Sequence, residues 1–398
     1  MNLTSDRKFY VIDFSAGNLI THHFDYALAY CKFLAGKGYE YELFTPKYLN
    51  STELDYQFRI NKILFSRNYR LLADKFTMWS IYYMLLKFLG IFGKMIEFVF
   101  GRLIIHFYIH LSYNKIIKSV QGNTIEVIFP SADFMAILLL KKMLSKKAKI
   151  SRFYLRLNAI DKNLTDLGIK IDGLEILENL MKKYPNIILG CETKNLINNL
   201  ITRSRIFQKA IWIPLPSNTK PTKQTSTSIY GFLGGAKKRK GFEEIPFWVR
   251  KITNMDNNSH FLIQQSPFSW PGYLETIAVL KSFRNTELLA SVLSHKEFFF
   301  QLERCSFIVA PYDPDSYQLV GSSLFYYAAD LLIPTITYAG VGFSYDITEF
   351  DCGLVIKNLD ENLNLGEINK SKLQAGLVNY NIFRNKQNMS FLNVPSID

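Results

Sequence analysis

Residues 306–340 limit the possible folds of this chain more narrowly than any other stretch. An apolar run at 307–310 is short enough for a buried parallel strand and ends at Pro311. A polar turn follows, small residues lead into a helix-like segment at 324–332, and a second apolar run begins at Pro334. This order predicts a βαβ unit. Its turn would present free backbone N–H groups and a positive helix end, which together favour an anion such as phosphate.

The same alternation recurs along the rest of the chain. An apolar run at 9–14 precedes a small-residue loop, a helix at about 23–37 and a strand at 39–44, and a second series begins at residue 229. The 398 residues suffice for two domains, and the most linker-like stretch is 217–227. We therefore predict an α/β protein with a hinge near residue 215. The predicted parts are a first domain at 1–215, a second domain at 216–375 and a C-terminal tail at 376–398, whose last residues look weakly ordered.

A basic, glycine-rich turn at 234–241 follows the predicted strand at 229–233. Gly234 and Gly235 allow close approach of the backbone to a ligand, and their N–H groups can bind phosphate oxygens. Lys238 and Lys240 supply positive charge for a diphosphate leaving group. A basic turn of this kind is often only a solvated loop. Its position ahead of the 306–340 unit favours a ligand site.

These motifs together resemble those of GT-B glycosyltransferases. P-Y-D-P-D-S-Y, G-S-S, Y-Y-A-A-D and P-T-I within 311–336 resemble the nucleotide-sugar-binding segment of that family. The 234–241 turn resembles the family's G-R-x-x-x-x-K-G motif, with Gly235 at the arginine position and Lys240 at the lysine position. The resemblance implies two Rossmann-like domains facing each other across a cleft, with a nucleotide sugar held mainly by residues 231–345. It covers the second domain well and the first only in outline.

The resemblance also implies which residues bind the donor. Backbone N–H groups, a helix end and lysines would bind the diphosphate, and polar side chains would bind the sugar and ribose. The diphosphate candidates are Gly234, Gly235, Lys238, Lys240, Ser322 and Ser323, and the sugar or ribose candidates are Asp313, Tyr317 and Tyr327. Retaining enzymes of this fold commonly carry two glutamates with seven residues between them. Aligned on Pro334, these positions hold Leu319 and Tyr327, so the stereochemistry is left open.

An acceptor hydroxyl must lose a proton during transfer, and the candidate bases lie in the first domain. They are His22 and His23, which follow the first small-residue loop, and Asp133, which follows the strand ending at Pro130. The two histidines are equally explained as the polar start of a helix. Residues 313–315 match a metal-binding D-x-D only superficially, because that motif belongs to a different glycosyltransferase fold. We expect a turn there, no metal and no cofactor.

The formal net charge of +13 indicates an anionic partner. Nucleic acid is the weakest candidate, because no arginine-rich tail, zinc-ligand spacing or RNA-recognition signature is present. Residues 76–113 are the most apolar and aromatic part of the chain, but Lys87, Lys94, Glu97 and Arg102 interrupt them too often for a transmembrane helix. A basic stripe beside apolar residues is typical of a helix lying on an anionic bilayer. A pair of core helices with one solvated edge explains the pattern equally.

Cysteine usage and the N-terminus indicate a cytoplasmic location. The four cysteines are scattered and form no C-x-x-C pair, which predicts buried free thiols in a reducing compartment. The N-terminus lacks a charged start, a long apolar run and a cleavage site, so we expect no signal peptide. Peripheral contact with the cytoplasmic membrane face is the expectation if residues 76–113 bind lipid.

The resemblance therefore implies a metal-independent hexosyltransferase. It would transfer a sugar from a UDP- or GDP-sugar to a glycan or lipid-linked acceptor in bacterial surface-polysaccharide or glycolipid synthesis. A catalytically impaired GT-B binding subunit is the alternative that the missing glutamates favour. A sugar-nucleotide epimerase of the same fold would need acid/base carboxylates near the sugar, which the sequence scarcely offers.

Overall fold

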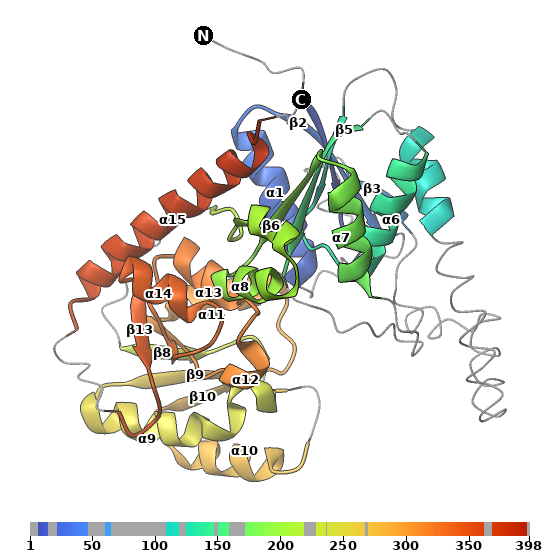
Figure 1. Ribbon diagram of the computed structural model, residues 1–398. Coiled ribbons are helices and arrows are strands. Elements are labelled where there is room, and N and C mark those ends of the chain that lie inside the picture. Colours follow the sequence, from blue (N-terminus) through green and yellow to red (C-terminus); the bar gives the residue numbers. More distant parts are fainter. Residues whose placement is uncertain are drawn as a thin grey trace, which may run out of the picture. The chain divides into compact units, whose positions relative to one another are not determined.

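The computed structural model describes residues 7–14, 22–46, 60–64, 109–118, 125–146, 150–158, 172–218, 228–235, 237–266, 270–361 and 368–395, without the side chains of His22, His23 and Ile63. The chain divides into two compact units (Figure 1). The first unit comprises Met1–Cys191, Leu200–Ile213 and Ser390–Asp398, and the second comprises Glu192–Asn199 and Pro214–Met389.

The first unit is built on a seven-stranded parallel sheet with the strand order β3-β2-β1-β4-β5-β6-β7. Its strands are β1 (Lys8–Ile12), β2 (Glu40–Pro46), β3 (Ile60–Leu64), β4 (Ile125–Phe129), β5 (Ile150–Leu157), β6 (Ile187–Cys191) and β7 (Ile211–Trp212). The connecting helices include α1 (His22–Gly36), α6 (Phe134–Ser145), α7 (Gly173–Lys183) and η1 (Arg205–Lys209). Helix α8 (Lys194–Arg203) is divided between the two units at Leu200. Strand β4 is buried along its whole length, as expected of a parallel strand covered on both faces.

The second unit is built on a six-stranded parallel sheet with the strand order β10-β9-β8-β11-β12-β13. Its strands are β8 (Ile229–Phe232), β9 (His260–Gln264), β10 (Thr286–Leu289), β11 (Phe307–Ala310), β12 (Thr335–Tyr338) and β13 (Gly353–Ile356). Its helices are η2 (Lys238–Lys240), η3 (Phe242–Glu244), α9 (Ile245–Met255), α10 (Tyr273–Ser282), α11 (His295–Arg304), α12 (Pro314–Tyr317), α13 (Ser323–Asp330), α14 (Ser344–Phe350) and α15 (Lys370–Leu392). The strands at 229–232, 307–310 and 335–338 confirm the predicted α/β alternation.

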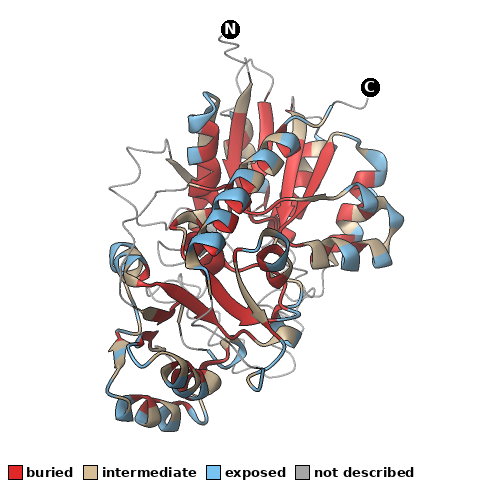
Figure 2. Ribbon diagram, turned by 90° about the vertical axis from the view of Figure 1, so that its left-hand side faces the viewer, coloured by how far each residue is buried: buried red, intermediate tan, exposed pale blue. Residues whose placement is uncertain are grey.

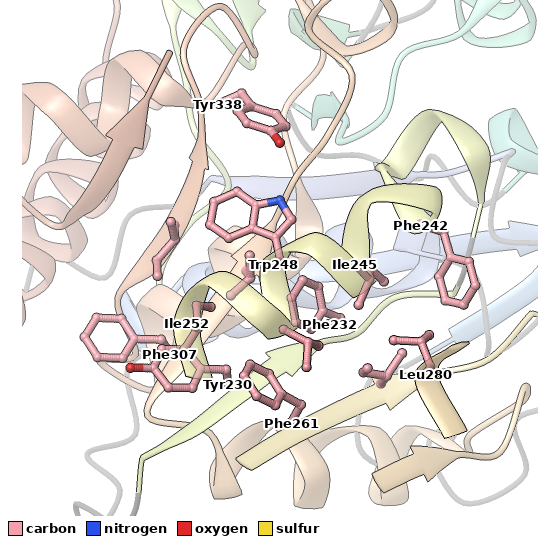
Figure 3. Packing of buried hydrophobic residues seen from close by; sticks show 14 of the residues in the cluster. Tyr230, Phe232, Phe242, Ile245, Trp248, Ile252, Phe261, Leu280, Phe307 and Tyr338 are labelled. Atoms are coloured by element: carbon pink, nitrogen blue, oxygen red, sulfur yellow. The ribbon is translucent and has the colours of Figure 1, made fainter. Parts of the chain in front are cut away.

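The core of the second unit is rich in aromatic side chains (Figure 3). Trp248 of α9 is fully buried. The ring of Tyr230 stacks on those of Phe261 and Phe307, with centroid distances of 5.7 and 5.6 Å. Strands β11 and β12 are buried along their whole length, whereas the edge strands β10 and β13 are partly exposed, as are the outer faces of the helices (Figure 2). This packing fixes the sheet from which the candidate site projects.

Most of the predicted C-terminal tail belongs to the long helix α15. Tyr380, Arg384 and Asn388 recur every four residues and are fully buried, so this face is anchored although the segment is rich in polar residues. Residues after Met389 belong to the first unit, where Arg7 Nη2 and the Tyr154 hydroxyl donate to the carbonyl of Leu392 (2.6 and 3.0 Å). The predicted boundary near 215 lies beside Pro214, but residues 192–199 pack with the second unit.

Cys31, Cys191, Cys305 and Cys352 are buried and free, which confirms that part of the cysteine prediction. Burial raises the pKa of the Cys305 thiol to about 12. The segment at 76–113 lies outside the described residues up to residue 108. Within the described ranges, none of the helices has the length and apolar character that a membrane span requires.

The fully buried Asp346 of α14 is expected to make stability depend on pH. Burial raises the pKa of its carboxyl group to about 7, and the negative charge of Glu192 adds to this rise. The Tyr380 hydroxyl, which donates to Oδ2 (2.5 Å), and the positive charges of Arg384 and Lys194 oppose it. The pKa of an aspartate in an unfolded chain is about 3.9. Between these values the folded chain retains the proton that the unfolded chain loses. The unfolding free energy therefore decreases as pH rises, by at most about 1.4 kcal/mol per pH unit from this group.

The variant Asp346→Asn keeps an acceptor for the Tyr380 hydroxyl and removes this titration. Urea unfolding followed by tryptophan fluorescence at pH 5, 6 and 7 measures the effect. We expect the variant to lose less stability than the wild type over this range. Parallel pH profiles for the two proteins would contradict the assignment.

Candidate functional site

The candidate site lies at the carboxyl ends of β8 and β11. These strands are neighbours in the sheet, with Tyr230 paired to Phe307 and Gly231 to Ile308, although β9 and β10 intervene in the sequence. Successive strands are therefore added to one side of β8 up to β10 and to its other side from β11 onward. In open parallel sheets, ligands bind at such a switch point, beyond the carboxyl ends of the strands. The glycine-rich turn and the turn after β11 both emerge there.

The glycine-rich turn depends on left-handed backbone conformations. Gly234, Gly235 and Gly241 have φ values of 93°, 76° and 70°, which favour glycine. A Cβ atom added to Gly241 would lie 1.9 Å from the carbonyl oxygen of Pro311. In addition, the backbone N–H of Asp313 donates to the carbonyl of Arg239 (3.2 Å). The two turns therefore pack directly on each other.

Lys240 faces the glycine turn, whereas Lys238 faces solvent. The Nζ atom of Lys240 donates to the carbonyl of Gly234 (2.5 Å) and lies 5.4 Å from the ring centroid of Tyr312. Burial lowers the pKa of Lys240; Tyr317 opposes this shift and Arg239 adds to it. The side chain of Lys238 is 76% exposed, and its Nζ lies 3.5 Å from Glu243 Oε2. Of these two predicted diphosphate ligands, the geometry favours Lys240.

Two tyrosines whose rings contact each other at a tilted angle line the turn after β11. The rings of Tyr312 and Tyr317 have centroids 4.5 Å apart, and the Arg239 guanidinium lies 5.6 Å from the Tyr317 centroid. Burial raises the pKa of Tyr312 to about 12, and a hydrogen bond with Ser322 opposes the rise. Both phenols are therefore neutral at physiological pH, and the cations beside them remain available to an anionic ligand.

Helix α13 directs its N-terminus to the same place. Ser322 is its N-cap, and its Oγ accepts the N–H of Phe325 (3.3 Å). The N–H groups of Ser323 and Leu324 have no hydrogen-bond partner among the residues described. A Cβ atom added to Gly234 would lie 3.9 Å from Leu324 Cδ2. The structure thus brings together the glycine turn, Lys240 and the first turn of α13.

Two of the predicted sugar or ribose ligands have other roles in the structure. The Asp313 carboxylate caps α12, accepting the N–H of Asp315 (3.2 Å) and the Ser316 hydroxyl (2.5 Å). The Tyr327 ring packs in the core, 5.2 Å from Phe299 between ring centroids. Core packing therefore accounts for Tyr327 better than ribose binding does. Tyr317 remains beside the site.

The predicted bases belong to the first unit. His22 and His23 begin α1, but their side chains lie outside the described residues. Asp133 is the N-cap of α6, and its Oδ1 accepts the N–H of Ala136 (3.0 Å). It follows β4, at the carboxyl edge where the order of the first sheet also changes direction. A base role for any of the three stays a prediction.

Two side chains at the second-unit site were not among the predicted residues. Gln264, the last residue of β9, accepts both the Gly234 and Gly235 N–H groups at Oε1 (2.8 and 3.1 Å). The carboxyl group of Glu192 lies against Gly321, where an added Cβ would be 2.4 Å from Glu192 Cδ. Gln264 could have been proposed from the sequence, because it is a polar residue at the carboxyl end of a mostly apolar strand. Glu192 follows β6 and reaches the second unit only through tertiary folding.

The described ranges contain no group of three or more histidine, cysteine or acidic side chains placed to hold a metal ion. No protein-family model matches the chain, and comparison with curated proteins gives no match.

Several solved structures resemble the chain over nearly its whole length. HepE from Anabaena in complex with UDP has 10% sequence identity and a TM-score of 0.59, covering 98% of this chain and 100% of that one. A glycosyltransferase from Rickettsia africae has 11% identity and a TM-score of 0.56, covering 98% and 99%. Sucrose-phosphate synthase from Thermosynechococcus elongatus has 12% identity and a TM-score of 0.55, covering 97% and 95%. With two parallel sheets that each change direction at a switch point, the chain has the GT-B fold, built from two Rossmann-like units.

Proposed function

We propose that this protein is a glycosyltransferase that binds a nucleotide sugar at the carboxyl ends of β8 and β11. The observation that carries the proposal is the convergence at the switch point of Lys240, the glycine turn and the Ser323 and Leu324 N–H groups, which have no partner among the described residues. An ammonium group and a helix N-terminus are what a diphosphate requires. The similar HepE structure contains UDP, which supports a nucleoside diphosphate as the ligand.

In the proposed reaction, an acceptor hydroxyl oxygen bonds to the anomeric carbon of the sugar as the bond to the diphosphate oxygen breaks. Negative charge grows on the departing diphosphate, and Lys240 with the Ser323 and Leu324 N–H groups offsets it. The hydroxyl proton passes to a base, for which His22, His23 and Asp133 remain the candidates.

The finer assignments extend the same proposal. The donor is a UDP- or GDP-hexose. Transfer requires no metal, because the lysine and the backbone N–H groups stabilise the negative charge of the departing diphosphate. The acceptor is a glycan or a lipid-linked glycan of bacterial surface-polysaccharide or glycolipid synthesis. The protein acts in the cytoplasm, and peripheral contact with an anionic membrane would bring it close to a lipid-linked acceptor.

A catalytically impaired binding subunit is the second candidate, and the loop before α13 favours it. Leu319 offers its carbonyl to the Thr193 hydroxyl (3.0 Å), and Tyr327 packs in the core. Neither position supplies a carboxylate. Radiolabelled UDP- and GDP-sugars separate the two functions, because an enzyme transfers or hydrolyses the label, whereas a binding subunit retains the donor unchanged.

Removal of the Lys240 charge tests the diphosphate site. Lys240→Met keeps the aliphatic stem and deletes the ammonium group. We expect the Kd for UDP or GDP to rise about 10- to 100-fold, since a hydrogen bond to a charged group contributes about 1.5–3 kcal/mol. Isothermal titration calorimetry measures the change, with thermal unfolding as a check on folding.

Lys238→Met is the matched control, because Lys238 carries the same charge two residues away but is mostly exposed. It should change the Kd less than twofold. Equal losses in the two variants would indicate a general effect of charge and would contradict a specific role for Lys240.

A further inference from the structure

The N–H groups of the glycine turn already have a partner within the protein. Gln264 Oε1 accepts both the Gly234 and the Gly235 N–H groups, and Gln264 Nε2 donates to the carbonyl of Ser291 (3.3 Å). Gln264 is only 8% exposed, so this carboxamide is fixed inside the protein. The carbonyl of Gly234 is also occupied, by Lys240 Nζ. Side chains therefore brace the turn on both its donor and its acceptor sides.

This arrangement changes which groups are free to bind an anion. A phosphate oxygen could reach the Gly234 and Gly235 N–H groups only by displacing Gln264 Oε1, which would leave a buried acceptor without a donor. The N–H groups of Ser323 and Leu324 have no partner in the described part of the chain, and Lys240 has donors beyond the one used by Gly234. Binding to the helix and the lysine therefore requires no bond to be broken.

We propose that Gln264 is a positioning residue for the nucleoside diphosphate. It holds the Gly234–Gly235 turn in its left-handed conformation, so that the carbonyl of Gly234 orients Lys240 beside the N-terminus of α13. The diphosphate is then bound by Lys240 and the helix, and the glycines act through their conformation. This inference rests on the proposed function of the same site.

The neutrality of the carboxamide is part of this role. A carboxylate at position 264 would lose the hydrogen bond to the Ser291 carbonyl but would still accept both N–H groups, which are the contacts that hold the turn. Because Gln264 and Lys240 both contact Gly234, that carboxylate would place a negative charge close to the ammonium group. Gln264→Glu thus separates the support of the turn from the electrostatics of the site, which Gln264→Ala does not.

Calorimetric titration of wild type, Gln264→Ala and Gln264→Glu with UDP and with uridine tests the proposal, or GDP and guanosine if the wild type prefers them. We expect the Kd for the diphosphate to rise about tenfold in Gln264→Ala, because the turn loses its brace. In Gln264→Glu the Kd should rise at least as much at low salt and less at high salt, whereas binding of the nucleoside should not change. Gln265→Ala is the matched control, since the Gln265 side chain donates to the Leu289 carbonyl and should leave the Kd within twofold.

Amide hydrogen exchange of the unliganded proteins tests the brace without any nucleotide. The Gly234 and Gly235 amides should exchange slowly in wild type and in Gln264→Glu but quickly in Gln264→Ala. Unchanged or tighter diphosphate binding by Gln264→Ala would overturn the inference, because the glycine N–H groups would then be the phosphate ligands and Gln264 their competitor. Failure of the wild type to bind any UDP, GDP or nucleotide sugar would instead overturn the proposed function, whatever the exchange data show.

Discussion

Replacement of Gly241 by alanine is expected to destabilise the second unit by about 3 kcal/mol or more. The φ angle of 70° alone costs a residue with a side chain about 1 kcal/mol or somewhat more. The added Cβ would also lie 1.9 Å from the Pro311 carbonyl oxygen. This oxygen belongs to the backbone and cannot rotate away, so the turn after β11 must move.

Gly235→Ala separates the two contributions. Gly235 has a similar φ of 76°, but an added Cβ would have no atom within 4 Å. It should therefore cost only the conformational part, about 1 kcal/mol. Urea unfolding followed by tryptophan fluorescence measures both variants. Equal losses would contradict the close packing of the two turns, and with it the structural basis of the proposed diphosphate site.

The sheets were predictable because parallel strands covered on both faces appear as short continuous apolar runs. The run at 307–310 and the residues after Pro334 became β11 and β12, with Ile308 paired to Thr335. The glycines and serines between such runs also indicated where the ligand-binding turns would be. Backbone conformation and helix capping are local properties, and local sequence reports them well.

Helix α15 shows where a pattern of hydrophobicity misleads. Its buried face includes Arg384 and Asn388, which are polar but form hydrogen bonds inside the protein. The sequence does not distinguish a polar residue in the core from one in solvent, so the four-residue spacing of the buried positions in α15 could not be recognised. Which polar residues find buried partners is decided by tertiary contacts, and the sequence alone does not reveal these.

The same limit applies to the site. The glycine turn and the α13 N-terminus follow from residue type and spacing, but their partner Gln264 does not. Its position beside Gly234 depends on the pairing of β8 with β9, and its carboxamide orientation depends on Ser291 after β10. Tyr327 shows the converse, because a motif position suggested a ligand and the packing of α13 placed the ring in the core.

Replacement of Arg384 by methionine is expected to cost about 3–5 kcal/mol, which is typical of breaking a buried ion pair. Arg384 is fully buried, and its Nη1 lies 2.8 Å from Asp330 Oδ1. Its guanidinium also donates to the carbonyls of Leu215 (2.6 Å) and Pro216 (3.2 Å) and to Asn381 Oδ1 (2.9 Å). One side chain thus joins α15 to α13 and to the segment at which the second unit begins.

Two further variants make this prediction specific. Arg304→Met breaks an exposed pair with Glu287 (2.8 Å) and should cost less than about 1 kcal/mol. Adding Asp330→Asn to Arg384→Met removes the carboxylate left without its cation, so the double variant should recover part of the loss. Equilibrium unfolding of the wild type, these three variants and Asp330→Asn alone measures these differences. If Arg384→Met loses no more stability than Arg304→Met, the guanidinium does not anchor α15. If the effects of Arg384→Met and Asp330→Asn on stability are fully additive, Asp330 is not the partner of Arg384.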